Sequence, residues 1–407
     1  MKKRVLLGIL FLGFIGCTNS EKNKEGKKPN VLIIVVDDLN DNIGILGGHG
    51  QARTPHMDTF AETASIFTQA FTNAPMCGPS RASMFTGIYP HNSNNYFQKP
   101  WYDYEVLNNS RTMMEQFKAA GYNVMGTGKI MHHNRSELWS SFGNEADYSP
   151  TPFDGEKQVP HPDVPKPFSD IGWVDGSLGP FINLEDRSNS EGKSLFWTTG
   201  NAKLGFKPMR YVNDDDRDPT PDELNAKWTA EKIEELAKKE SDQPFFLAVG
   251  FLRPHTPLVA PQKYFDLFPL EELELAIIRK NDVEDTHLQV AYQGDVFTLR
   301  FGKEMFDAIT KAYGSTELGL KKWTQAYLAC VAAVDDNVGQ VLDALDNSSL
   351  KENTIVVLAS DHGFHMGEKD YLYKNSLWEE STRVPLMMRV PGLTKENSKI
   401  EHTVSLI

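Results

Sequence analysis

The sequence predicts an α/β fold: a large, mostly parallel sheet with helices on both of its faces. Three continuous apolar runs, 30–36, 244–251 and 353–360, are rich in β-branched or aromatic residues. Such runs are typical of strands that are buried on both faces. Two segments with helical spacing of apolar residues, 221–239 and 323–345, lie between them. A chain of 407 residues is also long enough to bury a large core.

The remaining elements follow from local signals. Thr54 as the N-cap and Pro55 at the first position predict a helix that continues to 67. A further helix is expected over 111–120, and a short strand follows it at 122–126. From 135 to 219 the periodicity fades, so we expect long surface loops with at most short strands. An irregular stretch of this length is unusual unless it is functional.

Each predicted strand ends at residues that can carry charge or transfer a proton. In a doubly wound α/β sheet, ligands bind at the carboxyl ends of the strands. Four such ends therefore define a candidate site, and its residues are Asp37 and Asp38, then Lys129 and His132, then His255, and finally Asp361 and His362.

The overall charge restricts the partners of this chain. It contains 55 acidic residues against 42 Lys and Arg, a formal net charge of −13. This balance argues against nucleic acid as the main partner. Any anionic substrate must instead be met by a local cluster of Lys, Arg and His.

The N-terminus resembles an export signal. A basic start is followed by an apolar run, 5–15, that is too short to span a bilayer as a helix. Two interpretations are open for 1–17: a lipoprotein signal in which Cys17 is acylated, which we favour, or a simple secretory signal. Residues 18–29 would then be a flexible tether and 30–407 the folded domain that carries the candidate site. We expect an exported bacterial protein, periplasmic or anchored in the outer membrane, that meets the membrane only through its lipid.

The segment from Cys77 to Arg81, with the sequence CGPSR, precedes a predicted helix. Ser80 is a natural N-cap, and a cysteine beside an arginine at a helix N-terminus becomes reactive. The alternative is a buried free cysteine that packs as a small hydrophobe. Cys330 lies in the predicted 323–345 helix and is expected in the core, so no disulfide between the two is predicted.

The strand-end residues also indicate a type of chemistry. Three carboxylates placed close together must protonate or share a cation, and such oxygen-rich sites suit Ca²⁺ or Mg²⁺. Lys129, His132, His255 and Lys374 supply positive charge and proton-transfer groups. His133 and His365 are expected outside this set.

These residues carry a resemblance to a known family. The CGPSR segment with Thr86 and Gly87 resembles the signature of the formylglycine-dependent sulfatases. The runs 37–41, 47–49 and 53–55 look most like the iduronate-2-sulfatase-like branch. The resemblance extends from about residue 28 to the end, and it implies a three-layer αβα sandwich of the alkaline-phosphatase-like kind.

The resemblance also implies the cofactors. Cys77 would be oxidised by a formylglycine-generating maturase to Cα-formylglycine, whose hydrate is the nucleophile. One divalent ion, usually Ca²⁺ with Mg²⁺ as the second candidate, would bind residues that match the family's ligands: Asp37, Asp38, Cys77, Asp361 and His362. His362 stands where many relatives have Asn, and imidazole is a poor Ca²⁺ ligand, although the iduronate-2-sulfatase-like branch also has His here.

The resemblance further implies the catalytic roles. Arg81 and Lys129 would stabilise the nucleophile and the transferring group. His255 with Lys374 would bind sulfate and protonate the departing alcohol, and His132 would deprotonate the second hydroxyl to expel sulfate.

A sulfuric ester hydrolase acting on a sulfated carbohydrate is therefore expected. The alternatives are a phosphonate or phosphodiester hydrolase of the same superfamily, or an inactive lipid-anchored glycan-binding protein. The aromatic stretch 96–104 is either a sugar-binding wall or ordinary packing. Because relatives continue into a small C-terminal subdomain, we expect the chain to be truncated at 407.

Overall fold

The computed structural model describes residues 27–189, 191–239, 241–284 and 301–407. The predicted signal, 1–17, and most of the predicted tether, 18–29, lie outside the described residues. Residues at the end of the tether already contact the domain: Lys28 Nζ donates to Ala120 O, and Pro29 O accepts a hydrogen bond from the Tyr122 hydroxyl. None of the helices in the described part of the chain combines the length and apolar character that a membrane span requires.

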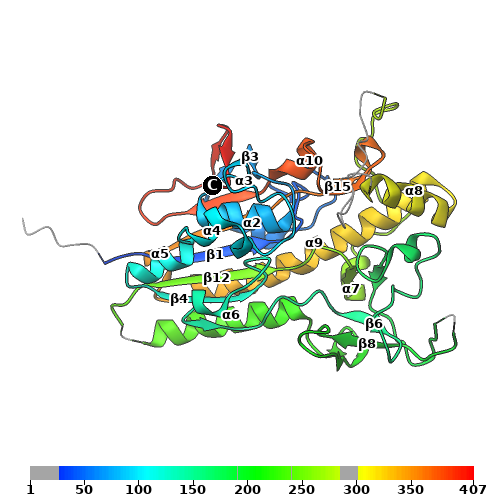
Figure 1. The fold of residues 1–407 in the computed structure, drawn as a ribbon, viewed down its shortest axis with the longest axis horizontal. Helices are drawn as coiled ribbons and strands as arrows, with labels where there is room; N and C mark the ends of the chain where they lie inside the picture. Colours follow the sequence, from blue (N-terminus) through cyan, green and yellow to red (C-terminus); the bar gives the residue numbers. More distant parts are fainter. Residues whose placement is uncertain (1–26, 190, 240, 285–300) are drawn as a thin grey trace, which may run out of the picture.

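The largest sheet among the described residues has eight strands in the order β19-β2-β18-β14-β1-β12-β4-β5. The strands β14, β1, β12, β4 and β5 run parallel, and β18 runs antiparallel to both of its neighbours. The prediction of a mostly parallel sheet is therefore confirmed (Figure 1). In spatial order the bounds are β19 (Ser398–Ile400), β2 (Ser65–Phe67), β18 (Leu386–Arg389), β14 (Thr354–Ser360), β1 (Asn30–Val36), β12 (Phe245–Phe251), β4 (Asn123–Gly128) and β5 (Ser141–Phe142).

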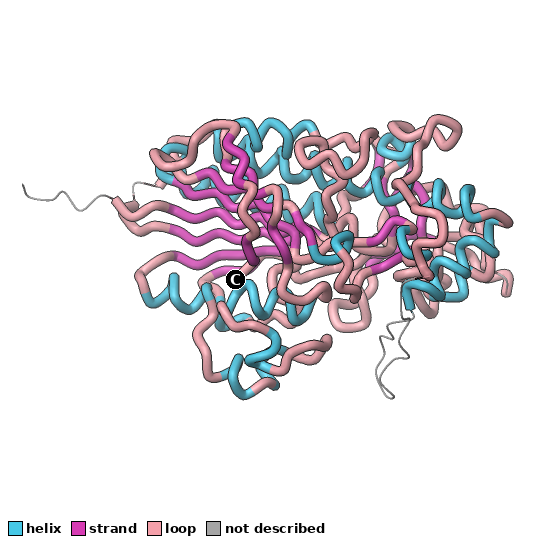
Figure 2. Tube along the Cα trace, turned by 90° about the horizontal axis from the view of Figure 1, so that it is seen from above, coloured by secondary structure: helices cyan, strands magenta, loops and turns pink. Residues whose placement is uncertain are grey.

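Helices cover both faces of this sheet (Figure 2). Successive side chains of a strand point to opposite faces, and β1 shows this clearly. Leu32, Ile34 and Val36 pack with α1, α6 and α9, whereas Val31, Ile33 and Val35 pack with α2, α4 and α5. The helix bounds are α1 (Pro55–Glu62), α2 (Cys77–Thr86), α3 (Pro90–Ser93), α4 (Glu105–Asn108), α5 (Met113–Ala119), α6 (Pro221–Lys238), α7 (Gln262–Phe265), α8 (Phe301–Tyr313), α9 (Thr316–Asp346) and α10 (Glu379–Thr382). This arrangement is the three-layer αβα sandwich that was predicted.

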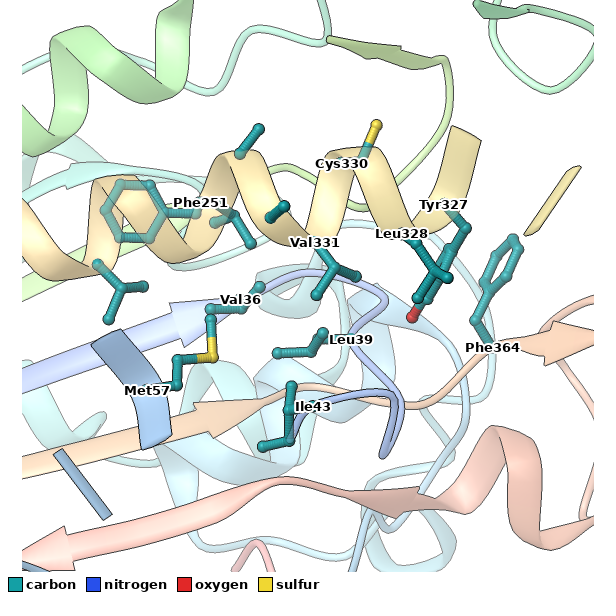
Figure 3. Packing of buried hydrophobic residues seen from close by; sticks show 14 of the residues in the cluster. Val36, Leu39, Ile43, Met57, Phe251, Tyr327, Leu328, Cys330, Val331 and Phe364 are labelled. Atoms are coloured by element: carbon teal, nitrogen blue, oxygen red, sulfur yellow. The ribbon is translucent and has the colours of Figure 1, made fainter. Parts of the chain in front are cut away.

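The long helix α9 forms the centre of one core. Its Leu328 and Val331 face Val36 and Leu39 across the layer (Figure 3). Cys330 is buried on the same helix and is free, as is Cys77. The prediction of a core Cys330 without a disulfide to Cys77 is therefore confirmed.

The helix predicted from 55 to 67 is wrong in its second half. Helix α1 ends at Glu62, and Ser65–Phe67 is the strand β2, which pairs with β18 and β19. Pairing with distant strands outweighs the local helical pattern there. Thr54 precedes the helix but does not cap it, because its hydroxyl donates to Asp58 Oδ2 and accepts from Gly44 N.

The stretch from 135 to 219 consists of long loops with short strands, as predicted. Among its described residues, two short sheets are formed within the stretch, β5 joins the eight-stranded sheet beside β4, and another strand pairs with a strand that lies beyond β12. That pair is β7 (Leu178–Pro180) with β13 (Leu258–Ala260), which run parallel. The others are β6 (Thr151–Phe153), β8 (Phe196–Thr199) and β9 (Lys207–Pro208), and the pair β10 (Tyr211–Asn213) and β11 (Asp216–Arg217).

Short pairs elsewhere complete the structure. They join β3 (Ala70–Phe71) with β17 (Arg383–Val384) and β20 (Val404–Ser405), and β15 (His365–Met366) with β16 (Leu372–Tyr373).

Candidate active site

The four strands that were predicted to carry the site are neighbours in the sheet. β14, β1, β12 and β4 lie side by side and parallel, with Val36 opposite both Ser360 and Phe251. Their carboxyl ends therefore meet at one edge. The structure places all the predicted site residues in one cluster there, and all except the half-buried His132 are buried.

Cys77 is the first residue of helix α2, so the prediction of a cysteine at a helix N-terminus holds. The prediction that Ser80 is the N-cap is wrong, because Ser80 lies inside the first turn and Met76 takes the cap position. The Ser80 hydroxyl instead donates to Asp361 O at 2.6 Å. This bond ties the helix start to the end of β14 and holds Cys77 against the carboxylates.

Arg81 organises the cluster from its centre. Its Nε donates to Asp361 Oδ2 at 2.8 Å, and its Nη2 lies 3.3 Å from Asp37 Oδ1. Its Nη1 donates to the carbonyls of Lys129 and Ile130. Asp37 also pairs with the Lys129 ammonium. One fully buried guanidinium therefore joins the ends of β1, β4 and β14. A guanidinium can do this because its several N–H donors point in different directions within one plane.

The Cys77 thiol faces several groups that can carry positive charge. His362 Nε2 lies 3.2 Å and Lys374 Nζ 3.4 Å from its Sγ. Burial alone would raise the pKa of the Cys77 thiol, but Lys129, Lys374 and His362 together lower that pKa well below its ordinary value. His132 contributes to the same lowering of the Cys77 pKa. The interpretation of Cys77 as an inert buried cysteine is therefore disfavoured.

Asp38 connects the remaining residues. It accepts two hydrogen bonds from Lys374 Nζ, at 2.6 and 2.8 Å, and lies 3.3 Å from His362 Nδ1. His255 Nε2 lies 3.9 Å from its Oδ2. Asp38 adopts a positive φ of 61°, which a residue with a side chain rarely takes and which is typical of functional sites. Tyr327 of α9 holds this backbone by donating its hydroxyl to Asp38 O at 2.7 Å.

The residues include a group that can hold a metal ion. Asp37, Asp38, Cys77 and His362 each offer a donor atom, and these atoms lie within 4.8 Å of one another. Asp361 Oδ2 lies 3.6 Å from His362 Nε2 and adds a third carboxylate to the group. A donor set rich in carboxylate oxygens favours hard cations over softer transition metals.

A cavity of about 220 Å³ adjoins this cluster. Lys129 and His132 form its inner wall, and Tyr102, His133 and Lys203 lie among its other lining residues. Of the aromatic stretch 96–104, Tyr102 lines the cavity, whereas Trp101 is buried and donates its Nε1 to His133 O. Among its other aromatic side chains, Tyr96 is exposed and Phe97 and Tyr104 are half-buried, so the stretch supplies one buried packing residue and one cavity-lining residue.

Sequence reasoning missed two residues that contact the cluster. The Tyr148 ring lies 4.9 Å from Lys129 Nζ and 5.0 Å from the His255 ring, and it also lines the cavity. Asp175 accepts a hydrogen bond from the hydroxyl of Thr256, the neighbour of His255. Both belong to the irregular stretch 135–219, where no local periodicity marks individual positions. The only sequence feature that indicated a functional role for this stretch was its unusual length.

His133 and His365 do not join the residues around Cys77, as predicted. His133 lines the outer cavity, and burial, His132 and Lys203 lower its pKa to about 4. His365 is fully buried, with Nε2 at 2.8 Å from Ser376 Oγ, and burial lowers its pKa to about 3.

His365 should make the protein less stable in acid. Between its ordinary pKa of 6.5 and about 3, the unfolded chain binds a proton at this position that the folded chain excludes. Stability is therefore lost as the pH falls below 6.5. Urea unfolding of wild type and His365→Gln should show wild type losing about 2 kcal/mol more between pH 7 and pH 5. Glu368, 4.0 Å away, has a pKa raised to about 7 by burial. Parallel losses in both proteins would show that His365 is protonated in the fold.

Comparison with known proteins places this site in context. A model of the sulfatase family matches residues 29–407. A protein named sulfatase from Formosa agariphila is 35% identical over 417 residues, which cover 100% of this chain and 73% of that protein. Human iduronate 2-sulfatase is 30% identical over 396 residues, which cover 95% of this chain. The chain spans 65% of the length of the human enzyme and 60% of the length of the mouse one.

Solved structures confirm the fold. A phosphonate monoester hydrolase from Silicibacter pomeroyi has a TM-score of 0.64 at 17% identity, covering 93% of this chain and 71% of that one. A protein solved with its substrate D-glucosamine-2-N,6-O-disulfate has a TM-score of 0.60 at 18% identity, covering 93% and 74%. These likenesses establish the alkaline-phosphatase-like fold. The family model extends over nearly the whole chain and includes the motif that begins at Cys77. The chain therefore belongs to the sulfatase family.

Proposed function

We propose that this protein hydrolyses sulfate esters of a sulfated carbohydrate at the cluster around Cys77. The observation that carries the proposal is the position of Cys77. It lies at a helix N-terminus, within 3.4 Å of both His362 and Lys374, in a cluster of buried carboxylates and cations. This arrangement provides a nucleophile position, charge stabilisation and proton-transfer groups in one buried place.

Two groups that the family implies would complete the site. Cα-formylglycine, made from Cys77 by a maturase, would supply an oxygen nucleophile. A divalent cation, Ca²⁺ or Mg²⁺, would be held by Asp37, Asp38, Asp361, His362 and residue 77, and it would supply Lewis-acid polarisation of the sulfate oxygens.

The chain's own residues would then bind the ester and move its protons. Lys129 and Arg81 place positive charge beside residue 77, where negative charge develops. His255 and Lys374, which both contact Asp38, are placed to bind the sulfate and to protonate the departing alcohol. His132, which helps to lower the pKa of the Cys77 side chain, is assigned the role of accepting a proton from residue 77.

The test of the proposal is the product released. Incubation with an aryl sulfate and with the matching aryl phosphonate should give sulfate at a much higher rate than phosphonate. A preference for the phosphonate would support the alternative, a phosphonate or phosphodiester hydrolase. Absence of turnover of either ester by protein converted at residue 77 would favour an inactive glycan-binding protein. The intact set of matching residues argues against that last alternative.

We infer from the residues that line the cavity that the carbohydrate substrate carries a second anionic group. Lys203, in the loop between β8 and β9, is exposed and lines the cavity together with Lys129 and His132. Its ammonium has no salt-bridge partner among the described residues, although it lies close enough to His133 to lower that ring's pKa. In a protein of net charge −13, an unpaired cation at a cavity wall is a favourable contact for a carboxylate or a second sulfate.

Replacing Lys203 should therefore affect binding of such substrates. For Lys203→Ala we expect a KM about 3- to 10-fold higher for a sulfated disaccharide that carries a second anion, because an exposed charge pair contributes about 1 kcal/mol. The kcat, and both constants for an aryl sulfate, should not change. Lys238→Ala, an exposed lysine on α6, is the control. Steady-state kinetics that show the same KM for both variants would contradict the assignment of Lys203.

We also propose that the protein is exported and anchored by a lipid on Cys17. The basic start, the short apolar run and the Gly16-Cys17 junction support this. Cys17→Ser should move the protein from the membrane fraction to the soluble fraction of bacterial cells, and an unchanged distribution would contradict the anchor.

A further inference from the structure

Asp175 lies beside His255 although the two residues belong to distant parts of the chain. Its Oδ1 accepts a hydrogen bond of 2.6 Å from Thr256 Oγ1. Thr256 is fully buried, and its hydroxyl lies 3.4 Å from His255 Nδ1. Burial raises the pKa of the Asp175 carboxyl, and the Thr256 hydrogen bond and the positive charges of His255 and Lys374 oppose that rise.

The fold fixes this contact through the pairing of β7 with β13. Leu178 of β7 lies opposite Leu258 of β13, and Leu258 N donates to Ser177 O at 3.0 Å. Asp175 precedes one strand of the pair by three positions, and Thr256 precedes the other by two. The irregular stretch 135–219 therefore places the Asp175 carboxylate next to the segment that carries His255.

The hydrogen bonds determine which ring nitrogen of His255 carries a proton. Thr256 O lies 2.6 Å from His255 Nδ1, and a carbonyl oxygen can only accept. Because the Thr256 hydroxyl donates to Asp175, its oxygen also presents lone pairs toward the ring. Nδ1 is therefore the protonated nitrogen of the neutral ring. Nε2, which lies 3.9 Å from Asp38 Oδ2, faces the reaction centre.

We propose that Asp175 is a positioning residue that acts through Thr256 to hold His255 as the acid for the leaving alcohol. This inference rests on the proposed function. As the bond between sulfur and the bridging oxygen breaks, its electron pair goes to that oxygen, which takes the proton from His255 Nε2. The new bond to sulfur comes from the oxygen nucleophile at position 77. The ring keeps its Nδ1 proton, whose hydrogen bond the Thr256 carbonyl accepts, and the bond from the Thr256 hydroxyl to Asp175 holds Thr256 in place for that contact.

The role can be tested by comparing substrates with different leaving groups. Asp175 should affect kcat only where the leaving alcohol must be protonated. For Asp175→Ala, which removes the acceptor that an Asn would keep, we expect kcat on a sugar sulfate to fall about 10- to 100-fold, a part of the roughly 10²- to 10⁴-fold that acid catalysis contributes. On 4-nitrophenyl sulfate, whose phenolate leaves without a proton, the fall should stay below about 3-fold. KM for both substrates should change little. Thr256→Val, which removes the hydroxyl at nearly constant size, should show the same selective loss and serves as the second variant.

Asp170→Ala is the matched control, since Asp170 is an exposed aspartate of the same stretch that pairs with Lys166. It should leave both substrates unaffected. Equal losses on the two substrates in both the Asp175 and Thr256 variants, or no loss on either substrate, would overturn the inference and leave the proposed function intact. A wild-type protein that hydrolyses neither ester would overturn both proposals.

Discussion

Cys77→Ala should abolish sulfate release while the protein stays folded. The position supplies the nucleophile of the proposed reaction, and removal of a nucleophile typically lowers kcat by a factor on the order of 10⁴ to 10⁶. The fold should tolerate the change, because alanine fits the buried site and Lys374 keeps both of its hydrogen bonds to Asp38. Sulfate would be measured by ion chromatography after incubation with an aryl sulfate.

Cys330→Ala is the matched control for this variant. Cys330 is also a buried free cysteine, but it lies in α9 and its thiol pKa is raised by burial to about 12. Its replacement should cost about 1 kcal/mol of stability and leave the rate of sulfate release unchanged. Substantial activity in Cys77→Ala would remove the chemical basis of the proposed function.

Arg81→Ala should have the largest effect on stability. The guanidinium is fully buried and bonds to Asp361, Asp37 and two carbonyls. Its loss leaves two buried carboxylates without their shared partner, which costs about 3–5 kcal/mol. The measurement is urea unfolding with a chelator present, so that no divalent cation offsets the charge of the carboxylates.

The control for Arg81 is an exposed arginine. Arg210 pairs with Asp216 at the surface, and such pairs contribute less than about 1 kcal/mol. If Arg81→Ala and Arg210→Ala lose the same stability, Arg81 does not join the three strand ends in the way described above.

The sequence was sufficient to predict that the strand-end residues of the candidate site lie together, because they follow strands that are neighbours in the sheet. Asp37 and Asp361 come immediately after apolar runs, and parallel neighbours bring the ends of such runs together. The same argument could not identify Asp175 or Tyr148. They reach the site through the β7–β13 pair and through loops, and such contacts between distant segments leave no local pattern in the sequence.

The wrong predictions for residues 65–67 and for Ser80 have a similar cause. Residues 65–67 continue an apolar helical pattern, but they form β2 because β18, more than 300 residues later in the chain, offers a strand partner. Ser80 has the right residue type for a cap, but its hydroxyl is used by Asp361 O. In both places a long-range contact outweighs a local preference that amounts to roughly 1 kcal/mol.

The central claim is that sulfate ester hydrolysis takes place at a modified residue 77. It can be tested by measuring the rate of sulfate release from wild-type preparations with different fractions of Cys77 converted to formylglycine, as determined by mass spectrometry of the peptide. The account predicts a rate proportional to the converted fraction, with no release from unconverted protein. A rate that is independent of conversion would contradict it.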